Sequence, residues 1–311
     1  MKTYPRVLTI AGSDSGGGAG IQADIKSISA TGSYAASAIT AVTVQNTLGV
    51  EAVHPVPIDV ITAQIDCVLS DIGADAIKIG MLHSAEVVLA VRDALLRNGA
   101  SNIVLDPVMV ATSGHRLIEE SAVLVLASEL LPLARVVTPN IPEAEILIGH
   151  QIKHQSELAD AAVELSRKAS SAVRGTPVMP GASVMPGASV MPGASVMPGP
   201  TGHPSACRVS VLMKAGHLTD DRLVDIFYNA EEDRILELPS ARIHTPNTHG
   251  TGCSLSSAFA SFLAQGYGLD DAARAATEFI HGAIASGAEY AIGHGHGPVD
   301  HFYRQRANSN H

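Results

Sequence analysis

Short apolar runs alternate along the chain with longer segments in which apolar residues recur every three or four positions. The runs predict buried strands, and the helical spacing predicts amphipathic helices between them. Strands that alternate with helices are typical of a parallel sheet covered by helices on both faces. We therefore expect an α/β fold with a mostly parallel central sheet. Its strands are expected at residues 7–11, 38–44, 76–79, 103–105, 135–137 and 209–213, with a hairpin or sheet edge at 223–228 and 235–238.

Glycine and polar residues follow the expected strands. In an open parallel sheet, ligands bind outside the carboxyl ends of the strands, so these residues should converge along one edge. Each alone could simply be a turn residue that ends a strand, but together they favour a binding site. The set consists of Gly12, Gln45, Lys78, Gly80, Asp106, Asn140 and Lys214.

A glycine-rich loop at residues 12–20 joins the first expected strand to a helix. It does not fit the GxxxxGK[ST] phosphate loop, because no lysine and hydroxyl pair follows at the required spacing. It also fails the GxGxxG dinucleotide pattern, because Ile21 stands where the third glycine belongs. The loop therefore predicts only a close approach of backbone to a ligand. Asp24, one turn into the helix, is either a solvated acid favoured by the helix dipole or a carboxylate that faces the ligand.

The sequence NTHGTGC at residues 247–253 precedes a segment with one apolar helical face. Gly250 and Gly252 thus lie at or just before a helix N-terminus, where unpaired N–H groups and the helix dipole suit an anion such as phosphate. Cys253 would lie in the first turn, where the pKa of a thiol can be lowered. The alternative is a glycine loop that only caps the helix, with Cys253 packed as a small apolar residue. These residues alone leave both interpretations open.

Composition limits the classes of partner. The chain has 311 residues, 46% of them apolar, which is enough to bury a large core. A formal net charge of −10 without a basic cluster argues against nucleic acid and anionic membranes. Cys67, Cys207 and Cys253 are widely spaced and form no CxxC pair, which favours a reducing cytoplasm over a disulfide framework or a zinc site. No apolar run is long enough for a membrane span, so we expect a cytoplasmic protein.

Two further segments have distinctive patterns. Residues 176–202 repeat the hexamer VMPGAS, and a proline in every copy excludes a helix or a ladder strand. We expect an expanded low-complexity loop there, with a docking strip as the alternative. The segment GHGHGPVDH at residues 293–301 holds three histidines. A loop beside the substrate or a phosphate is favoured over a metal site, because no carboxylate or thiol lies at a ligand spacing.

Eight motifs are spread over nearly the whole chain, with the exception of residues 176–202. They are LTIAGSDSGGGAGIQAD (8–24), VQNT (44–47), KIGML (78–82), LDPVM (105–109), TPNIPEA (138–144), LMKAGH (212–217), NTHGTGC (247–253) and GHGHGPV (293–299). Together they resemble the motifs of the hydroxymethylpyrimidine and phosphomethylpyrimidine kinases of thiamine biosynthesis, members of the ribokinase-like superfamily. The chain departs from the family pattern at Ala215, where a second glycine is common, and in the repeat.

This resemblance implies a single ribokinase-like kinase domain over residues 1–311, with the repeat as an insertion and the active site at the carboxyl ends of the strands. It implies transfer of the ATP γ-phosphoryl group to the hydroxymethyl group of the pyrimidine, followed by phosphorylation of the monophosphate to the diphosphate. It also implies Mg²⁺ as a cofactor and a homodimer. A pyridoxal kinase on the same fold and a non-catalytic binding protein are the alternatives.

The resemblance further implies roles on the phosphate side. Gly250, Thr251 and Gly252 would form an anion hole. Cys253 would act as the base or as the positioner of the attacking hydroxyl, and Lys214 would neutralise phosphate charge.

The nucleotide and metal are assigned in the same way. Asn140 and Glu143 match an NxxE element that acts on Mg²⁺ through water, and Asp106 lies close to the same metal and phosphate groups. Thr248 and Asn140, together with Lys214, would bind the nucleotide.

On the pyrimidine side, the resemblance implies a pocket in which Gln45 recognises the substrate by hydrogen bonds. Its carboxamide offers one donor and one acceptor, which match the ring nitrogen and exocyclic amine of the substrate. The alternative is a strand-end residue that bonds its own loop. The expected pocket residues are Gly12, Asp24, Gln45, Met81 and Val108.

Excision of residues 178–195 is expected to leave kcat/KM within a few-fold and to cost little stability. The repeat precedes a strand and so belongs to the edge of the sheet away from the site, and loop-closure free energy changes by only about 0.6 kcal/mol per doubling of length. Steady-state kinetics and circular dichroism of the shortened chain test this. A loss above about tenfold in a folded protein would contradict the expectation.

Overall fold

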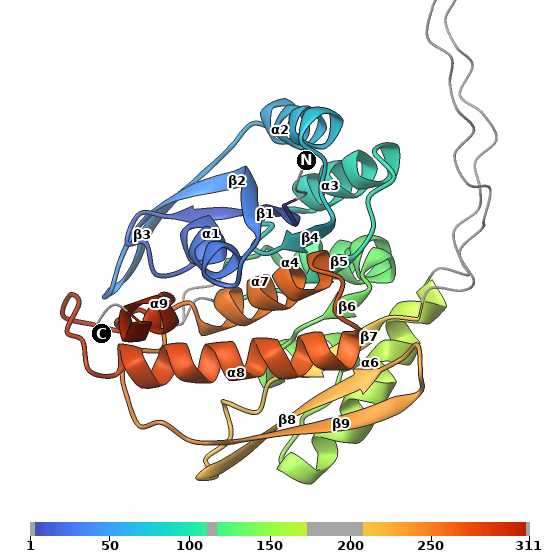
Figure 1. Cartoon of the computed structure of the whole chain (residues 1–311). Helices are drawn as coiled ribbons and strands as arrows, with labels where there is room; N and C mark the ends of the chain where they lie inside the picture. Colours follow the sequence, from blue (N-terminus) through green and yellow to red (C-terminus); the bar gives the residue numbers. More distant parts are fainter. Residues whose placement is uncertain (1–3, 111–116, 173–207, 309–311) are drawn as a thin grey trace, which may run out of the picture.

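The computed structural model describes residues 4–110, 117–172 and 208–308, in which one nine-stranded sheet lies between two layers of helices (Figure 1). The strand order is β3-β2-β1-β4-β5-β6-β7-β8-β9. Strands β2 through β7 of this order pair in parallel, whereas β3, β8 and β9 pair antiparallel with their neighbours. The mostly parallel α/β fold predicted from the sequence is confirmed. The strands are β1 Arg6–Asp14, β2 Tyr34–Asn46, β3 Gly49–Pro55, β4 Ala76–Ile79, β5 Ile103–Leu105, β6 Val136–Val137, β7 Ser210–Met213, β8 Arg222–Asn229 and β9 Arg234–Ala241.

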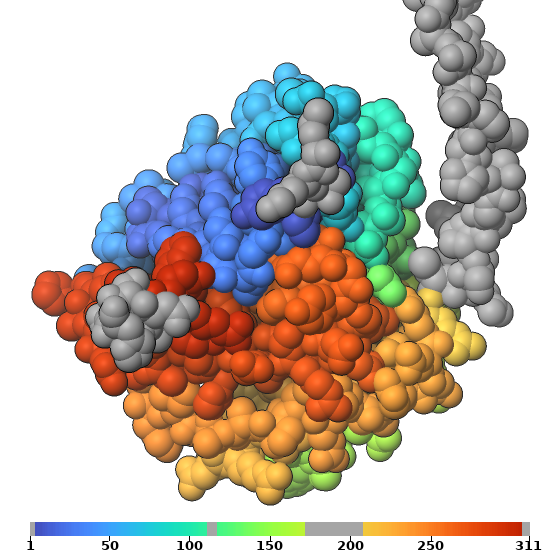
Figure 2. All heavy atoms as spheres, viewed as in Figure 1, coloured from blue at the N-terminus to red at the C-terminus, as the bar shows by residue number. Residues whose placement is uncertain are grey.

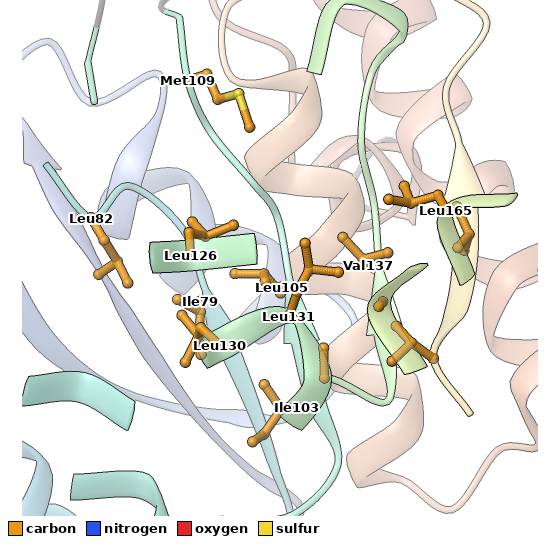
Figure 3. Packing of buried hydrophobic residues seen from close by; sticks show 14 of the residues in the cluster. Ile79, Leu82, Ile103, Leu105, Met109, Leu126, Leu130, Leu131, Val137 and Leu165 are labelled. Atoms are coloured by element: carbon orange, nitrogen blue, oxygen red, sulfur yellow. The ribbon is translucent and has the colours of Figure 1, made fainter. Parts of the chain in front are cut away.

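The strands of the parallel part are apolar on both sides, because alternate residues point into two separate cores. Leu8, Ile79 and Leu105 belong to the core under α2 to α6, part of which Figure 3 shows. Val7 and Val104 belong to the core under α1, α7 and α8. The helices are α1 Gly20–Ala30, α2 Ile58–Asp71, α3 Ala85–Arg97, α4 Glu120–Val125, α5 Ile141–Ile148, α6 Leu158–Ala172, α7 Thr251–Ala264, α8 Leu269–Gly287 and α9 Tyr303–Asn308.

Helices α7 and α8 lie side by side across one face of the sheet. In the space-filling view of Figure 2 they form the orange band between the blue N-terminal part and the lighter hairpin of β8 and β9. The apolar face predicted after Cys253 is buried, with Phe259 at 0% and Leu255 at 3% exposure. The helix next to NTHGTGC is therefore anchored in the core, and its N-terminus has a fixed position.

Some boundaries differ from the predictions. Strand β3 was not predicted, because it is an edge strand with mostly exposed residues and therefore has little apolar periodicity. The helical segment between β5 and β6 is not one regular helix, as the alternating pattern would suggest, but is divided into α4, a π-helical turn (Leu126–Leu130) and a 3₁₀ turn (Leu131–Leu133). Pro132 accounts for this division, since it cannot donate the backbone hydrogen bond of a regular helix.

The histidine-rich tail packs by its glycines. A Cβ on Gly295 would lie 2.0 Å from the Thr47 carbonyl oxygen, so only glycine fits against this turn. His294 and His296 point outward, whereas His301 is buried. In the parts of the chain that the structure describes, no group of three or more His, Cys, Asp or Glu residues is arranged to hold a metal ion.

Within the same described ranges, none of the helices has the length and apolar character needed to cross a membrane. The repeat at residues 176–202 lies outside the described residues. Its expected loop character, and the single domain into which it is inserted, stay predictions.

His301 should make the stability of the fold depend on pH. Its ring is 3% exposed, with Nε2 2.8 Å from Ser254 Oγ of α7, and burial lowers the pKa of His301 from 6.5 to about 4. The unfolded chain therefore takes up this proton first as pH falls. The contribution of His301 to the free energy of unfolding is complete above pH 6.5 and is lost between pH 6.5 and 4.

We expect His301→Gln to reduce the loss of stability over this pH range, as measured by urea unfolding at several pH values. The same change at an exposed histidine, His244→Gln, provides the control for the loss of one histidine from the chain. An unaltered pH dependence in His301→Gln would show that another group is responsible.

Candidate active site

A cavity of about 670 Å³ lies at the carboxyl ends of the parallel strands, between them and the N-terminus of α7. Residues from β8, β9 and α8 extend its wall. Of the residues that the sequence predicted for the site, Gly80 and Asp24 do not line this cavity. Those that line it are Gly12, Gln45, Lys78, Met81, Asp106, Val108, Asn140, Glu143, Lys214, Thr248, Gly250, Thr251, Gly252 and Cys253.

The N-terminus of α7 is held against the glycine loop of residues 12–20. Gly250 is the N-cap of α7 and has a φ of 80°, which favours glycine. A Cβ there would lie 1.8 Å from the Gly18 carbonyl oxygen. A Cβ on Gly252 would lie 3.2 Å from Lys214 Nζ and 3.5 Å from Asp106 Oδ2. The unpaired N–H groups of α7 therefore lie beside a lysine and a carboxylate in the cavity.

Lys214 and Asp106 form the charged centre of the cavity. Lys214 Nζ donates to Asp106 Oδ1 at 3.0 Å, and Thr138 Oγ1 donates to the same oxygen at 3.1 Å. Burial alone would lower the pKa of Lys214, but Asp106 and Glu143 outweigh it and raise that pKa. The ammonium group is thus charged at neutral pH and available to an anion.

Asn140 and Glu143 form a capping box at the start of α5. The Asn140 side chain accepts from the Glu143 N–H, and the Glu143 carboxylate accepts from the Asn140 N–H, both at 2.9 Å. Burial raises the pKa of Glu143 to about 7; Lys214 opposes this shift and Asp106 adds to it. The carboxyl group therefore changes charge near neutral pH.

On the opposite side, Gly12 and Gln45 lie at the ends of β1 and β2. A Cβ on Gly12 would lie 2.7 Å from Met81 Cε, so these two residues pack closely in the cavity wall. The Gln45 carboxamide lies 3.1 Å from Thr43 Oγ1 and 3.2 Å from His249 Nε2. It therefore contacts neighbouring strand and loop residues as well as the cavity.

Comparison with known proteins identifies the family. The family model for phosphomethylpyrimidine kinase matches residues 14–184 and 203–300. The chain belongs to the phosphomethylpyrimidine kinase family. It is 44% identical over 297 residues to the hydroxymethylpyrimidine/phosphomethylpyrimidine kinase of Rhizobium meliloti, covering 96% of this chain and 97% of that protein.

Two further relatives extend the comparison. The thiamine biosynthesis bifunctional protein ThiED of Geobacter sulfurreducens is 41% identical over 300 residues, which cover 96% of this chain and 53% of that protein. The crystal structure of Bacillus subtilis pyridoxal kinase in complex with ADP is similar with a TM-score of 0.76 at 30% identity, covering 97% of this chain and 99% of that one. The family member described here is therefore a phosphotransferase with the ribokinase-like fold.

Asp24 is neither solvated nor facing the cavity, so both sequence interpretations of it are wrong. It is 0% exposed and accepts hydrogen bonds from Lys78 Nζ at 2.8 and 2.9 Å, from Thr9 Oγ1 at 2.6 Å and from Ser257 Oγ at 2.7 Å. Burial acts to lower the pKa of Lys78, but Asp24 and other anions raise it. Asp24 thus joins α1 to β4 and α7 beneath the cavity. The sequence alone does not predict this ion pair, because Lys78 and Asp24 are 54 positions apart and Lys78 also fits the pattern of a residue at a strand end.

Of the two interpretations that the sequence left open for Cys253, the one with a lowered pKa is wrong. Burial raises the pKa of the Cys253 thiol to about 11, although the Lys78 ammonium acts in the opposite direction. Asp24 and Asp106 add to the rise. The position at the helix N-terminus was predicted correctly, but desolvation and two carboxylates outweigh the dipole.

Sequence reasoning assigned no role to several other cavity residues. Asp14 and His249 belong to the motifs at residues 8–24 and 247–253, but only the fold shows that they contact each other. Thr277 of α8 carries a buried hydroxyl for which the described residues offer no hydrogen-bond partner. Asp225 of β8 accepts from the Ala215 N–H at 2.7 Å, and burial raises its pKa to about 6. No motif pointed to the last two.

The Cys253 thiol should react slowly with iodoacetamide in the ligand-free protein at pH 7.5, because a thiol with a pKa of about 11 is almost entirely protonated there. Its rate should rise about tenfold per pH unit up to about pH 10. Mass spectrometry of the Cys253 peptide measures this, with the exposed Cys67 as a reference in the same sample. Labelling of Cys253 at pH 7.5 as fast as Cys67 would contradict the raised pKa.

Proposed function

We propose that the protein phosphorylates 4-amino-5-hydroxymethyl-2-methylpyrimidine (HMP) with ATP, and then its monophosphate to the diphosphate, in thiamine biosynthesis. The observation that carries the proposal is the shared cavity. In it, the α7 N-terminus, Lys214 and Asp106 face a polar wall that contains Gln45. Phosphoryl transfer depends mainly on positioning and on neutralised oxygens, and this arrangement supplies both.

The nucleotide would occupy the end of the cavity formed by β8, β9 and α8. Leu223, Ile243, Ile280 and Ile284 give this end an apolar lining that suits a purine ring. The unpartnered hydroxyl of Thr277 would donate to or accept from the nucleotide, which would remove the cost of burying it unpaired.

The phosphates would then extend toward α7. The N–H groups of Gly250, Thr251 and Gly252 would hold the transferring phosphoryl group, with Lys214 countering its charge. Asn140 and Thr248 would lie along the nucleotide.

Cys253 would position the attacking hydroxyl group rather than remove its proton, since its thiol is protonated at neutral pH. A loose transition state places little demand on a base before the phosphorus–oxygen bond forms. The substrate oxygen would bond to the γ-phosphorus as the bond to ADP breaks. The hydroxyl proton would leave only after bond formation has begun, and it would pass to an oxygen of the transferred phosphoryl group.

Asp106 and Glu143 fit a Mg²⁺ site. Mg²⁺ prefers oxygen ligands and is commonly held by one or two carboxylates together with substrate phosphates and water. The Asp106 carboxylate already accepts a hydrogen bond from the Lys214 ammonium group. The pKa of about 7 means that the Glu143 carboxylate is available as a ligand near neutral pH. When bound, the ion would neutralise phosphate charge. Since the described residues form no group of three ligands, the phosphates would complete the site.

The relatives, which are named as kinases, do not favour the two alternatives considered from the sequence, a pyridoxal kinase and a binding protein without turnover. An assay of ADP release separates them when HMP, pyridoxal or no substrate is added. We expect HMP to release ADP far faster than pyridoxal. Equal rates would favour the pyridoxal alternative, and no release with either would favour the binding protein. Cytoplasmic location and a homodimer stay predictions, which fractionation and sedimentation would test.

Gln45→Met should lower kcat/KM for HMP about tenfold or more and should narrow or reverse the preference over pyridoxal. Gln45 can pair with the amine and ring nitrogen of HMP, and pyridoxal lacks the amine. A buried group left unpaired costs about 1–3 kcal/mol. Kinetics with both substrates measure the ratio, and Gln151→Met, an exposed position, is the control. An unchanged ratio would show that Gln45 does not discriminate.

A further inference from the structure

Asp14, His249 and Gln45 meet at one end of the cavity, although they come from β1, from the loop before α7 and from β2. His249 Nε2 lies 2.9 Å from Asp14 Oδ2 and 3.2 Å from the Gln45 carboxamide. His249 and Asp14 are 8% and 2% exposed. A single ring nitrogen therefore contacts both a carboxylate and the amide proposed to recognise the substrate.

Asp14 can only accept hydrogen bonds in this position. Its Oδ1 accepts from the Gly16 N–H at 2.8 Å, and its Oδ2 accepts from the N–H groups of Gly18 and Ala19 at 3.0 and 2.7 Å. Burial acts to raise the pKa of Asp14, but the hydrogen bonds from His249 and the backbone outweigh it and lower that pKa. Because an ionised carboxylate offers no proton, His249 Nε2 must be the donor.

That proton decides which way the Gln45 carboxamide faces. The oxygen and nitrogen of a carboxamide are nearly the same in shape, so the hydrogen-bond partners assign them. The structure places Gln45 Nε2 3.2 Å from His249 Nε2, where two N–H donors would face each other. We therefore turn the carboxamide over. With the oxygen there, the His249 N–H donates to both Asp14 and Gln45.

Thr43 leads independently to the same orientation. Its hydroxyl has one proton, which it donates to the Ser13 carbonyl oxygen at 2.9 Å. The structure places Gln45 Oε1 3.1 Å from Thr43 Oγ1, where this oxygen would find no proton left to accept. If the carboxamide is turned over, its nitrogen donates to Thr43 Oγ1 instead. The carboxamide nitrogen belongs on that side, which again leaves its oxygen beside His249.

The ring of His249 has little room to move. A Cβ on Gly18 would lie 2.3 Å from His249 Cδ2, so the glycine loop packs directly on the ring. The backbone N–H of His249 donates to the Gly297 carbonyl oxygen at 3.0 Å. The loop before α7, the glycine loop and the C-terminal loop together hold the imidazole in one place.

We propose that His249, held by Asp14, is a positioning residue that fixes the Gln45 carboxamide with its oxygen beside His249 and its nitrogen beside Thr43. The inference rests on the proposed function and deepens it. One lone pair and one N–H of the carboxamide remain for the substrate. The exocyclic amine of HMP would donate on the His249 side, and the ring nitrogen would accept on the Thr43 side. In the reverse orientation, the N–H of the carboxamide would face the amine of HMP, and its oxygen would face the ring nitrogen, so neither hydrogen bond could form.

A double-mutant cycle tests the positioning role. His249→Leu removes the donor, and His249→Gln keeps an N–H at similar reach. We expect His249→Leu to raise KM for HMP about tenfold while kcat and KM for ATP change less than about twofold, and His249→Gln to restore most of the loss. In a Gln45→Met background, His249→Leu should change KM for HMP by less than about twofold, because nothing remains to be oriented.

The same effect of His249→Leu with and without Gln45 would overturn the inference, as would a fall in kcat alone. Circular dichroism checks that each variant is folded. Failure of the proposed function is separate, since it appears in the unmodified protein as an absence of HMP-dependent ADP release.

A spectroscopic test does not depend on activity or on variants. Nitrogen NMR of the ligand-free protein at pH 8, with the His249 ring assigned through bonds among the 14 histidines, reports which nitrogen carries the proton. The inference requires a proton on Nε2. An unprotonated Nε2, with the proton on Nδ1 alone, would overturn it whether or not HMP is the substrate.

Discussion

The contact between two glycine-rich loops is the constraint on which the site depends. Gly250 begins α7 with a positive φ and lies against the Gly18 carbonyl oxygen, where no side chain would fit. Helix α7 is anchored behind this contact by a buried apolar face. Its free N–H groups are thereby brought to the ends of the parallel strands, next to Lys214 and Asp106. The proposed anion binding and the proposed substrate recognition both depend on that approach, since His249 belongs to the same loop.

Buried charges around the site are matched in pairs. Asp24 and Lys78 neutralise each other beneath the cavity, and Asp106 and Lys214 do so within it. An unpaired charge would be very costly at this depth, whereas a paired one is tolerated. The same depth explains why the Cys253 thiol keeps its proton and why the Glu143 carboxyl group titrates near neutral pH. Charged phosphates entering the cavity would therefore meet a site that is almost electrically balanced before they bind.

Similarity to both phosphomethylpyrimidine and pyridoxal kinases shows how little of the fold needs to change between substrates. The phosphate side, built from a helix N-terminus and a lysine, is indifferent to the ring that carries the hydroxyl group. Under the proposed function, discrimination between these rings falls to polar atoms on the other wall, among them those of the Gln45 carboxamide. A carboxamide can recognise the hydrogen-bonding edge of a ring only when its oxygen and its nitrogen are fixed in one orientation. The residues that fix this orientation therefore matter as much as the carboxamide itself.

By itself, the sequence determined the parallel α/β architecture, the edge of the sheet where the cavity lies, and the helix N-terminus within residues 247–253. These follow from local spacing and from the rule that strand ends of a parallel sheet converge. Only the tertiary structure decided that Asp24 is buried against Lys78, that the pKa of Cys253 rises, and that His249 lies between Asp14 and Gln45. Each of these depends on partners more than 30 positions away or on depth beneath the surface, and neither is encoded in a local pattern.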